Sequence, residues 1–287
     1  MDSSIWAGSP AAIHHHYDVG NDFWQQWLDP TMSYSCALWD DKIAANDLKA
    51  AQINKHRWHL DRAGVTNGGS LLDIGSGWGA LLNTYANSVP GNQRSATGLT
   101  LSREQKKYCD ALSLANSEFR EENWLDHVPA APYDGIVSMG AFEHFAKLLS
   151  SHDEKMEVYT AFFSRCRSWL DRGCYLTLQT VAYGSMLSEA QNMFIANEIF
   201  PEAELPRVFE IFKAAEGLFE VTEFRNDRLQ YARTCDLWLR NMQKNKATII
   251  EIAGADTYDI YEKYIKLSLT GFLQGSILLV RLQLKAL

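Results

Sequence analysis

Three glycines separated by single residues follow an apolar run and could form a ligand-binding turn. The run Leu71–Ile74 reads as a buried strand, Gly75, Gly77 and Gly79 follow it, and a helical pattern begins at Ala80. Glycine lets the backbone turn sharply and approach a bound ligand closely. The spacing differs from the Gly-x-Gly-x-x-Gly of dinucleotide sites, and no Gly-Lys-Ser/Thr of a phosphate-binding loop follows. Taken alone, the motif also fits an ordinary tight turn between a strand and a helix.

Strand-like and helical runs alternate on both sides of this motif. The alternation predicts a doubly wound α/β domain, with a parallel sheet covered by helices on both faces. Ligands of such sheets bind beyond the carboxyl ends of the strands, where the glycines stand. The expected elements are the strands Ser70–Gly75, Arg94–Thr100, Tyr133–Met139 and Tyr175–Val181 and the helices Ala80–Ser88, Arg103–Ala115 and Asp153–Leu170.

The flanking parts of the chain are expected to complete one domain over residues 1–287. Residues 1–65 read as mostly helical, with a helix over Asp40–Ala63, and the cofactor-binding core covers 66–182. A helical cap interrupted by Pro201 and Pro206 is predicted for 183–217. The part 218–287 is expected to hold the strands Phe219–Phe224 and Ile277–Gln283 and the helices Tyr231–Lys246 and Thr257–Lys266.

Composition and charge describe a globular protein. The chain has 287 residues, of which 46% are apolar and 22% charged, as in globular domains. A net charge of −8 and a pI near 5.5 argue against a nucleic-acid partner, and more weakly against an anionic membrane. No apolar run approaches the ~18 to 20 residues of a membrane-spanning helix. We therefore expect neither nucleic-acid binding nor stable membrane insertion.

The cysteines and histidines do not predict a metal site. Five scattered cysteines without a Cys-x-x-Cys pair indicate a reducing compartment and no zinc. The N-terminus lacks the pattern of a secretion signal, so the expected location is cytoplasmic. The run His14–His16 reads as a polar segment, because three adjacent histidines cannot share one helix face. The oligomeric state is left open.

Four further segments accompany the glycine turn: His16–Phe23 with Leu28–Ala37, Gly98–Ser102 with Gln105, Val137–Phe145 and Gln230–Trp238. Together with that turn, their order and spacing resemble those of the cyclopropane fatty acid and mycolic acid cyclopropane synthases over nearly the whole chain. That family belongs to the class I S-adenosylmethionine-dependent methyltransferases, which have a Rossmann-like sheet.

The resemblance implies S-adenosylmethionine as the cofactor. It places Thr100, Leu101 and Gln105 where most methyltransferases hold the ribose with an acidic residue, and it stacks Trp124 near the adenine. An acidic side chain at Asp73 could orient the glycine turn or reach the ammonium of the cofactor's tail. For the tyrosines, core packing is the alternative role. The cofactor-binding residues implied are Tyr17, Tyr34, Ser35, Asp73, Gly75, Gly77, Gly79, Thr100, Leu101, Gln105, Trp124 and Met139.

The resemblance also implies methylation of a carbon–carbon double bond. An alkene is a weak nucleophile, so rate must come from alignment and the exclusion of water. Methyl transfer leaves a carbocation, which aromatic faces stabilise by ~0.5 to 2 kcal/mol each. In the family a bicarbonate takes the last proton, and its ligands map onto the Cys36 backbone, Glu143, Tyr231 and a fifth-strand histidine. Gln179 stands at that histidine's position, with neither charge nor proton exchange near neutral pH.

Gln179 and an apparently short cap suggest a changed acceptor. The leading interpretation is a C-methyltransferase of natural product biosynthesis that methylates the alkene of a hydrophobic small molecule. A prenyl or terpenoid chain is the acceptor expected, as in a teleocidin-type prenyl C-methyltransferase, with a cation that rearranges or cyclises. The alternatives are a cyclopropane or branched-chain lipid synthase, a small-molecule N-methyltransferase and a non-catalytic binder. A structural role at a strand end is the alternative for Glu143.

Overall fold

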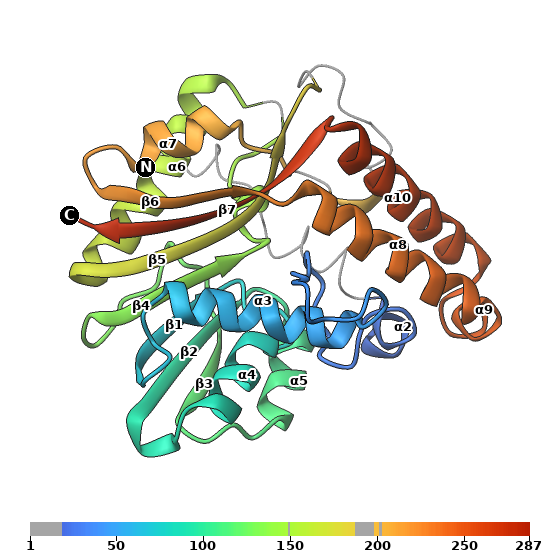
Figure 1. Ribbon diagram of the computed structural model, residues 1–287, viewed down its shortest axis with the longest axis horizontal. Coiled ribbons are helices and arrows are strands. Elements are labelled where there is room, and N and C mark those ends of the chain that lie inside the picture. The colour runs from blue at the N-terminus through green and yellow to red at the C-terminus, as the bar shows by residue number, and fades with distance from the viewer. Residues whose placement is uncertain (1–18, 149, 187–197, 201–202) are drawn as a thin grey trace.

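The computed structural model describes residues 19–148, 150–186, 198–200 and 203–287. Its strands form one sheet with the order β3-β2-β1-β4-β5-β7-β6 (Figure 1). The strands β1 to β5 pair in parallel, whereas β7 lies antiparallel between β5 and β6. The strands are β1 Gly69–Ile74, β2 Arg94–Thr100, β3 Ser117–Glu121, β4 Tyr133–Met139, β5 Leu170–Tyr183, β6 Phe219–Asn226 and β7 Ile277–Ala286.

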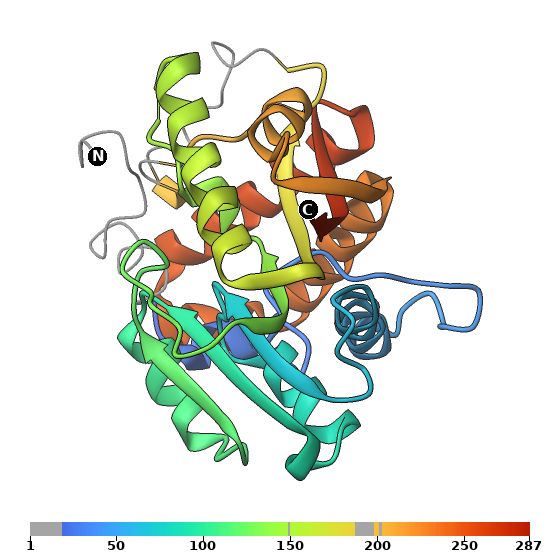
Figure 2. The ribbon, with the colours of Figure 1, turned by 90° about the vertical axis from the view of Figure 1, so that its left-hand side faces the viewer.

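Helices cover both faces of the sheet and one of its ends. Helices α3, α4 and α5 lie on one face and α6 and α7 on the other, while α2 and α8 to α10 gather beyond the carboxyl ends of β1 and β4 (Figures 1 and 2). No helix among the described residues has the length and apolar character needed to cross a membrane. The helices are α2 Asn21–Gln25, α3 Leu48–Arg62, α4 Ala80–Ser88, α5 Arg103–Ala111, α6 His152–Ser168, α7 Val208–Ala215, α8 Arg228–Lys244, α9 Lys246–Ala253 and α10 Ala255–Gln274.

The alternation of side chains along the central strands supplies a core on each face. Leu72 and Ile136 pack with the aromatic rings of α6 on one face, and Leu71 and Val137 pack with α4 on the other, as the two-residue period of a strand requires. A third cluster joins the N-terminal segment to α8 and α10, with Trp24 fully buried at its centre. The doubly wound α/β class is confirmed.

Several predicted elements need correction. The sheet is not all parallel, and β3 was not predicted. Residues 26–47 are mostly not helical, and α3 begins at Leu48 rather than near Asp40. Its start is fixed by Asp47, whose Oδ1 accepts a hydrogen bond of 2.9 Å from the Ala50 N–H, the usual N-cap arrangement.

Of the segment 183–217, which was predicted to be a helical cap, only some of the described residues cover a cavity. Residues 187–197 and 201–202 of that segment lie outside the described residues. Its one described α-helix, α7, packs on α6 and β6 and belongs to the outer layer. Lys155 of α6 holds the segment in place, because its Nζ donates to the Leu205 carbonyl at 3.0 Å and pairs with Glu210 at 2.9 Å. The described residues that do cover a cavity are Met186, Phe200, Ala203 and Leu205.

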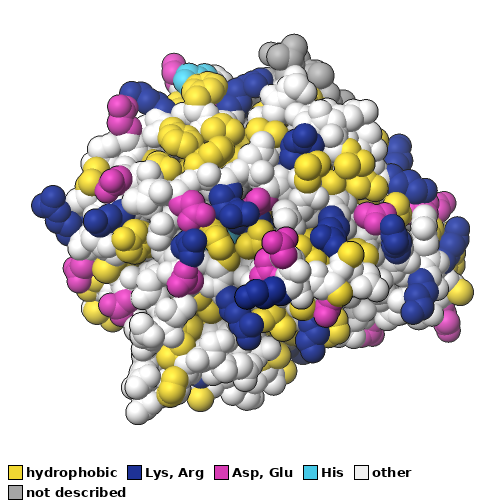
Figure 3. Space-filling model, in the orientation of Figure 1, with side chains coloured by type: hydrophobic (Ala, Val, Ile, Leu, Met, Phe, Trp, Pro, Cys, Tyr) yellow, Lys and Arg dark blue, Asp and Glu magenta, His cyan; other side chains and the backbone are white. Residues whose placement is uncertain are grey.

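The charged side chains of the surface are mixed in sign. On the face shown in Figure 3, lysines and arginines alternate with acidic residues, and no continuous basic field appears.

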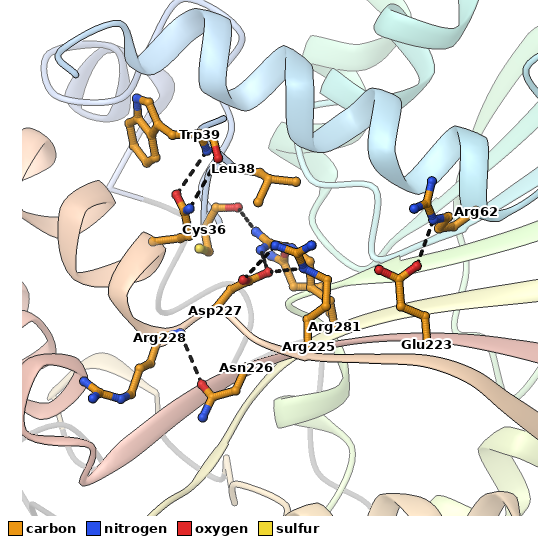
Figure 4. Close-up of polar contacts among 12 residues, drawn as sticks. Cys36, Leu38, Trp39, Arg62, Glu223, Arg225, Asn226, Asp227, Arg228 and Arg281 are labelled. Atoms are coloured by element: carbon orange, nitrogen blue, oxygen red, sulfur yellow. Dashed lines mark hydrogen bonds and ion pairs between the residues drawn. The ribbon is translucent and has the colours of Figure 1, made fainter. Parts of the chain in front are cut away.

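A buried arginine joins four parts of the fold (Figure 4). Arg281 of β7 is fully buried. Its Nε donates to Gln179 Oε1 of β5 at 2.8 Å, and its Nη2 donates to the carbonyls of Cys36 and Ala37 at 2.9 and 3.1 Å. Its Nη1 pairs with Asp227, the residue before α8. This guanidinium links the N-terminal segment, β5, β7 and the start of α8.

Replacing this arginine should destabilise the whole protein. Arg281→Met fills a similar volume but removes the donor to three carbonyl oxygens, those of Cys36, Ala37 and the Gln179 side chain, and leaves Asp227 with Arg225 as its paired cation. We therefore expect a loss of about 3–5 kcal/mol in the free energy of unfolding. Urea unfolding followed by circular dichroism measures it. The exposed Arg172 provides the control Arg172→Met, expected within about 0.5 kcal/mol of the parent. A loss below about 1 kcal/mol for Arg281→Met would contradict this role.

Candidate active site

Three cavities meet at the carboxyl end of β4. Their volumes are about 320, 100 and 70 Å³, and all three are lined by Gly140. Gly140 continues the pairing of β4 with β5, since its N–H donates to the backbone carbonyl of Gln179 at 2.9 Å. A φ of +70° fits glycine, and an added Cβ would meet no atom within 4 Å. The site is therefore open where the three cavities join.

The two smaller cavities lie on either side of the glycine turn. Gly75 has a φ of +83°, and a Cβ there would lie 2.5 Å from the Cβ of Ala141. Gly77 has a φ of +53° and lines both cavities. Gly79 lines neither of them. It precedes α4, and a Cβ at this position would lie 2.9 Å from the Phe119 ring.

The 70 Å³ cavity carries buried charged groups. Asp73 is buried, burial raises its pKa to about 7, and among the described residues its Oδ1 has no hydrogen-bond partner. Ser35 Oγ accepts a hydrogen bond of 2.7 Å from Lys55 Nζ. Burial lowers the pKa of Lys55 to about 7. This small space therefore offers an acid, a base and a hydroxyl to a polar ligand.

The 100 Å³ cavity combines a flat aromatic wall with amide and hydroxyl groups. Trp124 lines it and packs on Phe145 and Phe162, with ring centroids 5.0 and 5.4 Å apart. Thr100 Oγ1 donates to Gln105 Oε1 at 2.8 Å, which leaves the amide N–H groups of Gln105 as donors. Leu101 and two residues that the sequence did not single out, Glu122 and Asn123, complete this wall.

The 320 Å³ cavity is mainly apolar and contains a buried carboxyl group. Glu143 Oε1 accepts a hydrogen bond of 2.6 Å from the Val181 N–H, and within the described part of the chain its Oε2 has no partner. Burial raises the pKa of Glu143 to about 7. A carboxyl with this pKa can hold or release a proton near neutral pH. The aromatic and imidazole rings that line the cavity belong to Tyr34, His144, Phe200, Tyr231, Tyr264 and Phe272.

Two of these rings have environments that limit their chemistry. Tyr231 stacks on Phe272 with ring centroids 4.4 Å apart and planes at 26°, and burial raises the pKa of its hydroxyl well above the ordinary value. Burial lowers the pKa of His144 to about 4. Near neutral pH, both side chains are therefore uncharged.

Gln179 and Cys36 lie at the back of the site beside Arg281. The carbonyl oxygen of the Gln179 side chain accepts from Arg281, and a guanidinium can only donate. This hydrogen bond fixes the Gln179 amide with its oxygen toward Arg281. Cys36 is fully buried, its carbonyl also accepts from Arg281, and burial raises the pKa of its thiol to about 11. It is not among the described residues that line the three cavities.

The structure thus brings most of the predicted residues together. The 320 Å³ cavity is lined by Glu143, Tyr231 and Gln179. The described residues do not include Tyr17 or His14–His16. Sequence reasoning missed Lys55, His144 and Arg281. The signal in the sequence was a charged residue, Arg281, inside the otherwise apolar run of β7. The predicted cofactor residues that line the two smaller cavities are Tyr34, Ser35, Asp73, Gly75, Gly77, Thr100, Leu101, Gln105, Trp124 and Met139.

Comparison with known proteins decides the family. The family model described as mycolic acid cyclopropane synthetase matches residues 8–282. The chain belongs to this family. Cyclopropane mycolic acid synthase 1 of Mycobacterium tuberculosis is 34% identical to it over 275 residues, which cover 89% of this chain and 90% of that protein. This family uses S-adenosylmethionine, and its members are methyltransferases.

Solved structures of family members share the fold over nearly the whole chain. The cyclopropane synthase MmaA2 from Mycobacterium tuberculosis superimposes with a TM-score of 0.85 at 30% identity, covering 97% of this chain and 99% of that one. The synthase CmaA1 complexed with SAH and CTAB gives the same TM-score, identity and coverage. The class I methyltransferase fold and the methyltransferase activity are therefore confirmed for this chain.

The residues present fit S-adenosylmethionine. The unpartnered Oδ1 of Asp73 suits the ammonium of an amino-acid tail, and the turn at Gly77 leaves open space where a side chain would stand. Trp124 offers an aromatic wall for a nucleobase. The fit rests on the two smaller cavities and leaves the 320 Å³ cavity for a second ligand.

An alanine at the junction of the cavities should impair cofactor binding. Gly140→Ala places a methyl group in the open space, so we expect the affinity for S-adenosylhomocysteine to fall roughly tenfold, or about 1.4 kcal/mol. Isothermal titration calorimetry measures this affinity. Gly173→Ala is the control, because Gly173 also has a positive φ and an open Cβ direction but stands near the other end of β5. Equal affinities for the two variants would contradict the assignment of this junction.

Proposed function

We propose that the protein transfers the methyl group of S-adenosylmethionine to a carbon–carbon double bond of a long acyl chain. A cyclopropane ring or a methyl branch on that chain would be the product. The observation that supports this most directly is the apolar 320 Å³ cavity, which meets both cofactor cavities at Gly140 and contains Glu143. Ligand cavities typically combine an apolar lining with a few polar groups in this way.

An acyl acceptor has better support than the prenyl acceptor that Gln179 and the cap suggested. The relatives at 32–34% identity are named for mycolic acids, and CmaA1 was solved with CTAB, which carries a long alkyl chain. Gln179 has a structural explanation in this chain, since it receives a hydrogen bond from Arg281. Its difference from histidine therefore does not by itself require another acceptor.

The cofactor is proposed to bind across the two smaller cavities, where its sulfonium supplies an electrophilic methyl group. Trp124 would face the adenine, and the amide N–H groups of Gln105 would bind the ribose hydroxyls. Asp73 and Ser35 would bind the amino-acid tail. The methyl group then lies beside Gly140, the residue shared by all three cavities.

The acceptor cavity would supply alignment and exclude water. The two electrons of the alkene would form the new carbon–carbon bond as the methyl–sulfur bond breaks, which would leave a cation on the acceptor. The faces of Tyr231, Phe272 and Tyr264 line this space and stabilise a nearby cation by about 0.5–2 kcal/mol each. The carboxylate of Glu143 adds a full negative charge on the same wall.

Glu143 is also the group best placed to remove the final proton. It would take a proton from the newly added methyl carbon, and the electrons of that C–H bond would close the ring. Gln179 cannot replace it, because a neutral amide does not exchange protons near neutral pH. The Cys36 thiol stays protonated with a pKa of about 11.

Removing the charge of Glu143 should abolish turnover without loss of cofactor binding. Glu143→Gln keeps the acceptor for the Val181 N–H, so we expect kcat to fall about 10²–10⁴-fold. The affinity for S-adenosylhomocysteine should change little. Because burial raises the pKa of Glu143 to about 7, wild-type kcat/KM should rise as the pH increases through 7, where the base loses its proton. The exposed Glu220 gives the control Glu220→Gln. Full activity of Glu143→Gln would exclude this base.

The acceptor class can be tested with a labelled methyl donor. The protein is incubated with methyl-labelled S-adenosylmethionine and either unsaturated phospholipid vesicles, unsaturated acyl thioesters or prenylated aromatic compounds. Mass spectrometry then locates the label. Label in a ring or branch of an acyl chain is the expected result. Label on a prenyl carbon, with none on the acyl substrates, would overturn the acyl assignment and restore the prenyl one.

A further inference from the structure

Lys55 is a buried cation that sequence analysis did not assign to the site. It lies on α3, is only 1% exposed and lines the 70 Å³ cavity beside the glycine turn. One of its three N–H donors binds Ser35 Oγ at 2.7 Å. Among the described residues, no carboxylate oxygen lies within 4.0 Å of its Nζ and no second hydrogen-bond acceptor is present. Within the described part of the chain, two of the three N–H donors of Lys55 are therefore free to bind a ligand.

Two carboxyl groups, a guanidinium and an imidazole lie near Lys55. Asp29 and Asp73 lie near enough to act on it electrostatically, and each has an Oδ1 without a partner in the described part of the chain. Arg281 is also near, but it is engaged by four acceptors. The neighbouring imidazole of His56 is buried, and its pKa is well below the ordinary value, so it stays neutral. Lys55 is thus the cation with free donors at this cavity.

The amino-acid tail of S-adenosylmethionine has a matching pair of charges. Its α-carboxylate needs donors and a positive charge, and its α-ammonium needs an acceptor with a negative charge. The cavity offers the Lys55 ammonium and the Ser35 hydroxyl for the first and Asp73 Oδ1 for the second. Because Ser35 Oγ accepts from Lys55, its own proton remains available to donate.

We propose that Lys55 binds the α-carboxylate of the cofactor, together with the Ser35 hydroxyl, while Asp73 binds the α-ammonium. This inference rests on S-adenosylmethionine as the cofactor and does not depend on which acceptor is methylated. A buried charge without a partner is costly, and the zwitterionic tail would supply the opposite charges that Lys55 and Asp73 lack among the described residues. A methyl donor without the carboxylate would be bound much less well.

Two ligands that differ only in the carboxylate separate this role from a structural one. The affinities of wild type and Lys55→Met are measured by calorimetry for S-adenosylhomocysteine and for its decarboxylated analogue. We expect Lys55→Met to weaken S-adenosylhomocysteine roughly 10- to 100-fold and the analogue less than about threefold. Lys49→Met, on the exposed face of the same helix, should leave both affinities unchanged.

These binding measurements contain no acceptor, so their results do not depend on which acceptor is methylated. An equal loss of affinity for both ligands would make Lys55 a structural residue, and an unchanged affinity for S-adenosylhomocysteine would place the carboxylate elsewhere. Either result overturns the proposal. Should Lys55→Met not fold, Ser35→Ala provides the same test, with an expected loss of roughly three- to tenfold for S-adenosylhomocysteine only.

Discussion

The buried guanidinium of Arg281 is the interaction on which the rest of the site depends. It holds the Cys36 and Ala37 carbonyls of the N-terminal segment, the Gln179 side chain of β5 and Asp227 before α8. These segments provide walls of both the cofactor and the acceptor cavities. A buried arginine without partners is costly. The four contacts can form together only when these segments keep their relative positions. One side chain thereby fixes the position of the acceptor cavity relative to the cofactor.

The arrangement of cavities follows from the reactivity of an alkene. A weak nucleophile reacts with a methyl donor only when the two are aligned and water is excluded. The mainly apolar 320 Å³ cavity, proposed for the acceptor, and the two smaller cavities, proposed for the cofactor, share Gly140. The charges are divided in the same way. Lys55 and Asp73 line the 70 Å³ cavity proposed for the cofactor, and Glu143 lines the 320 Å³ cavity proposed for the acceptor, where positive charge would develop.

The sequence predicted the framework better than the details. The bounds of β2, β4 and α4 were predicted correctly, because each is a short apolar or amphipathic run bounded by a turn or a cap. The antiparallel β7 could not be inferred from residue pattern, since its buried apolar residues look the same in either direction. The helix over Asp40–Ala63 was started too early, because Ile43 continues the apolar spacing of α3, whereas Asp47 caps that helix before Leu48.

The candidate site was predictable where a local motif carries it. The glycine turn, Thr100 to Gln105 and Glu143 each stand in a recognisable segment. Lys55 and Arg281 act through contacts between residues far apart in the chain, and only the folded structure shows them. The division of the chain into a cofactor core and an inserted cap stays a prediction.

A crystal structure of the complex with S-adenosylhomocysteine tests the central claim most directly, namely that the methyl donor faces the acceptor cavity at Gly140. The account predicts the cofactor's sulfur beside Gly140, with an unobstructed path into the cavity that contains Glu143 and Tyr231. A sulfur that points away from this cavity, or a side chain closing the path between them, would contradict the account.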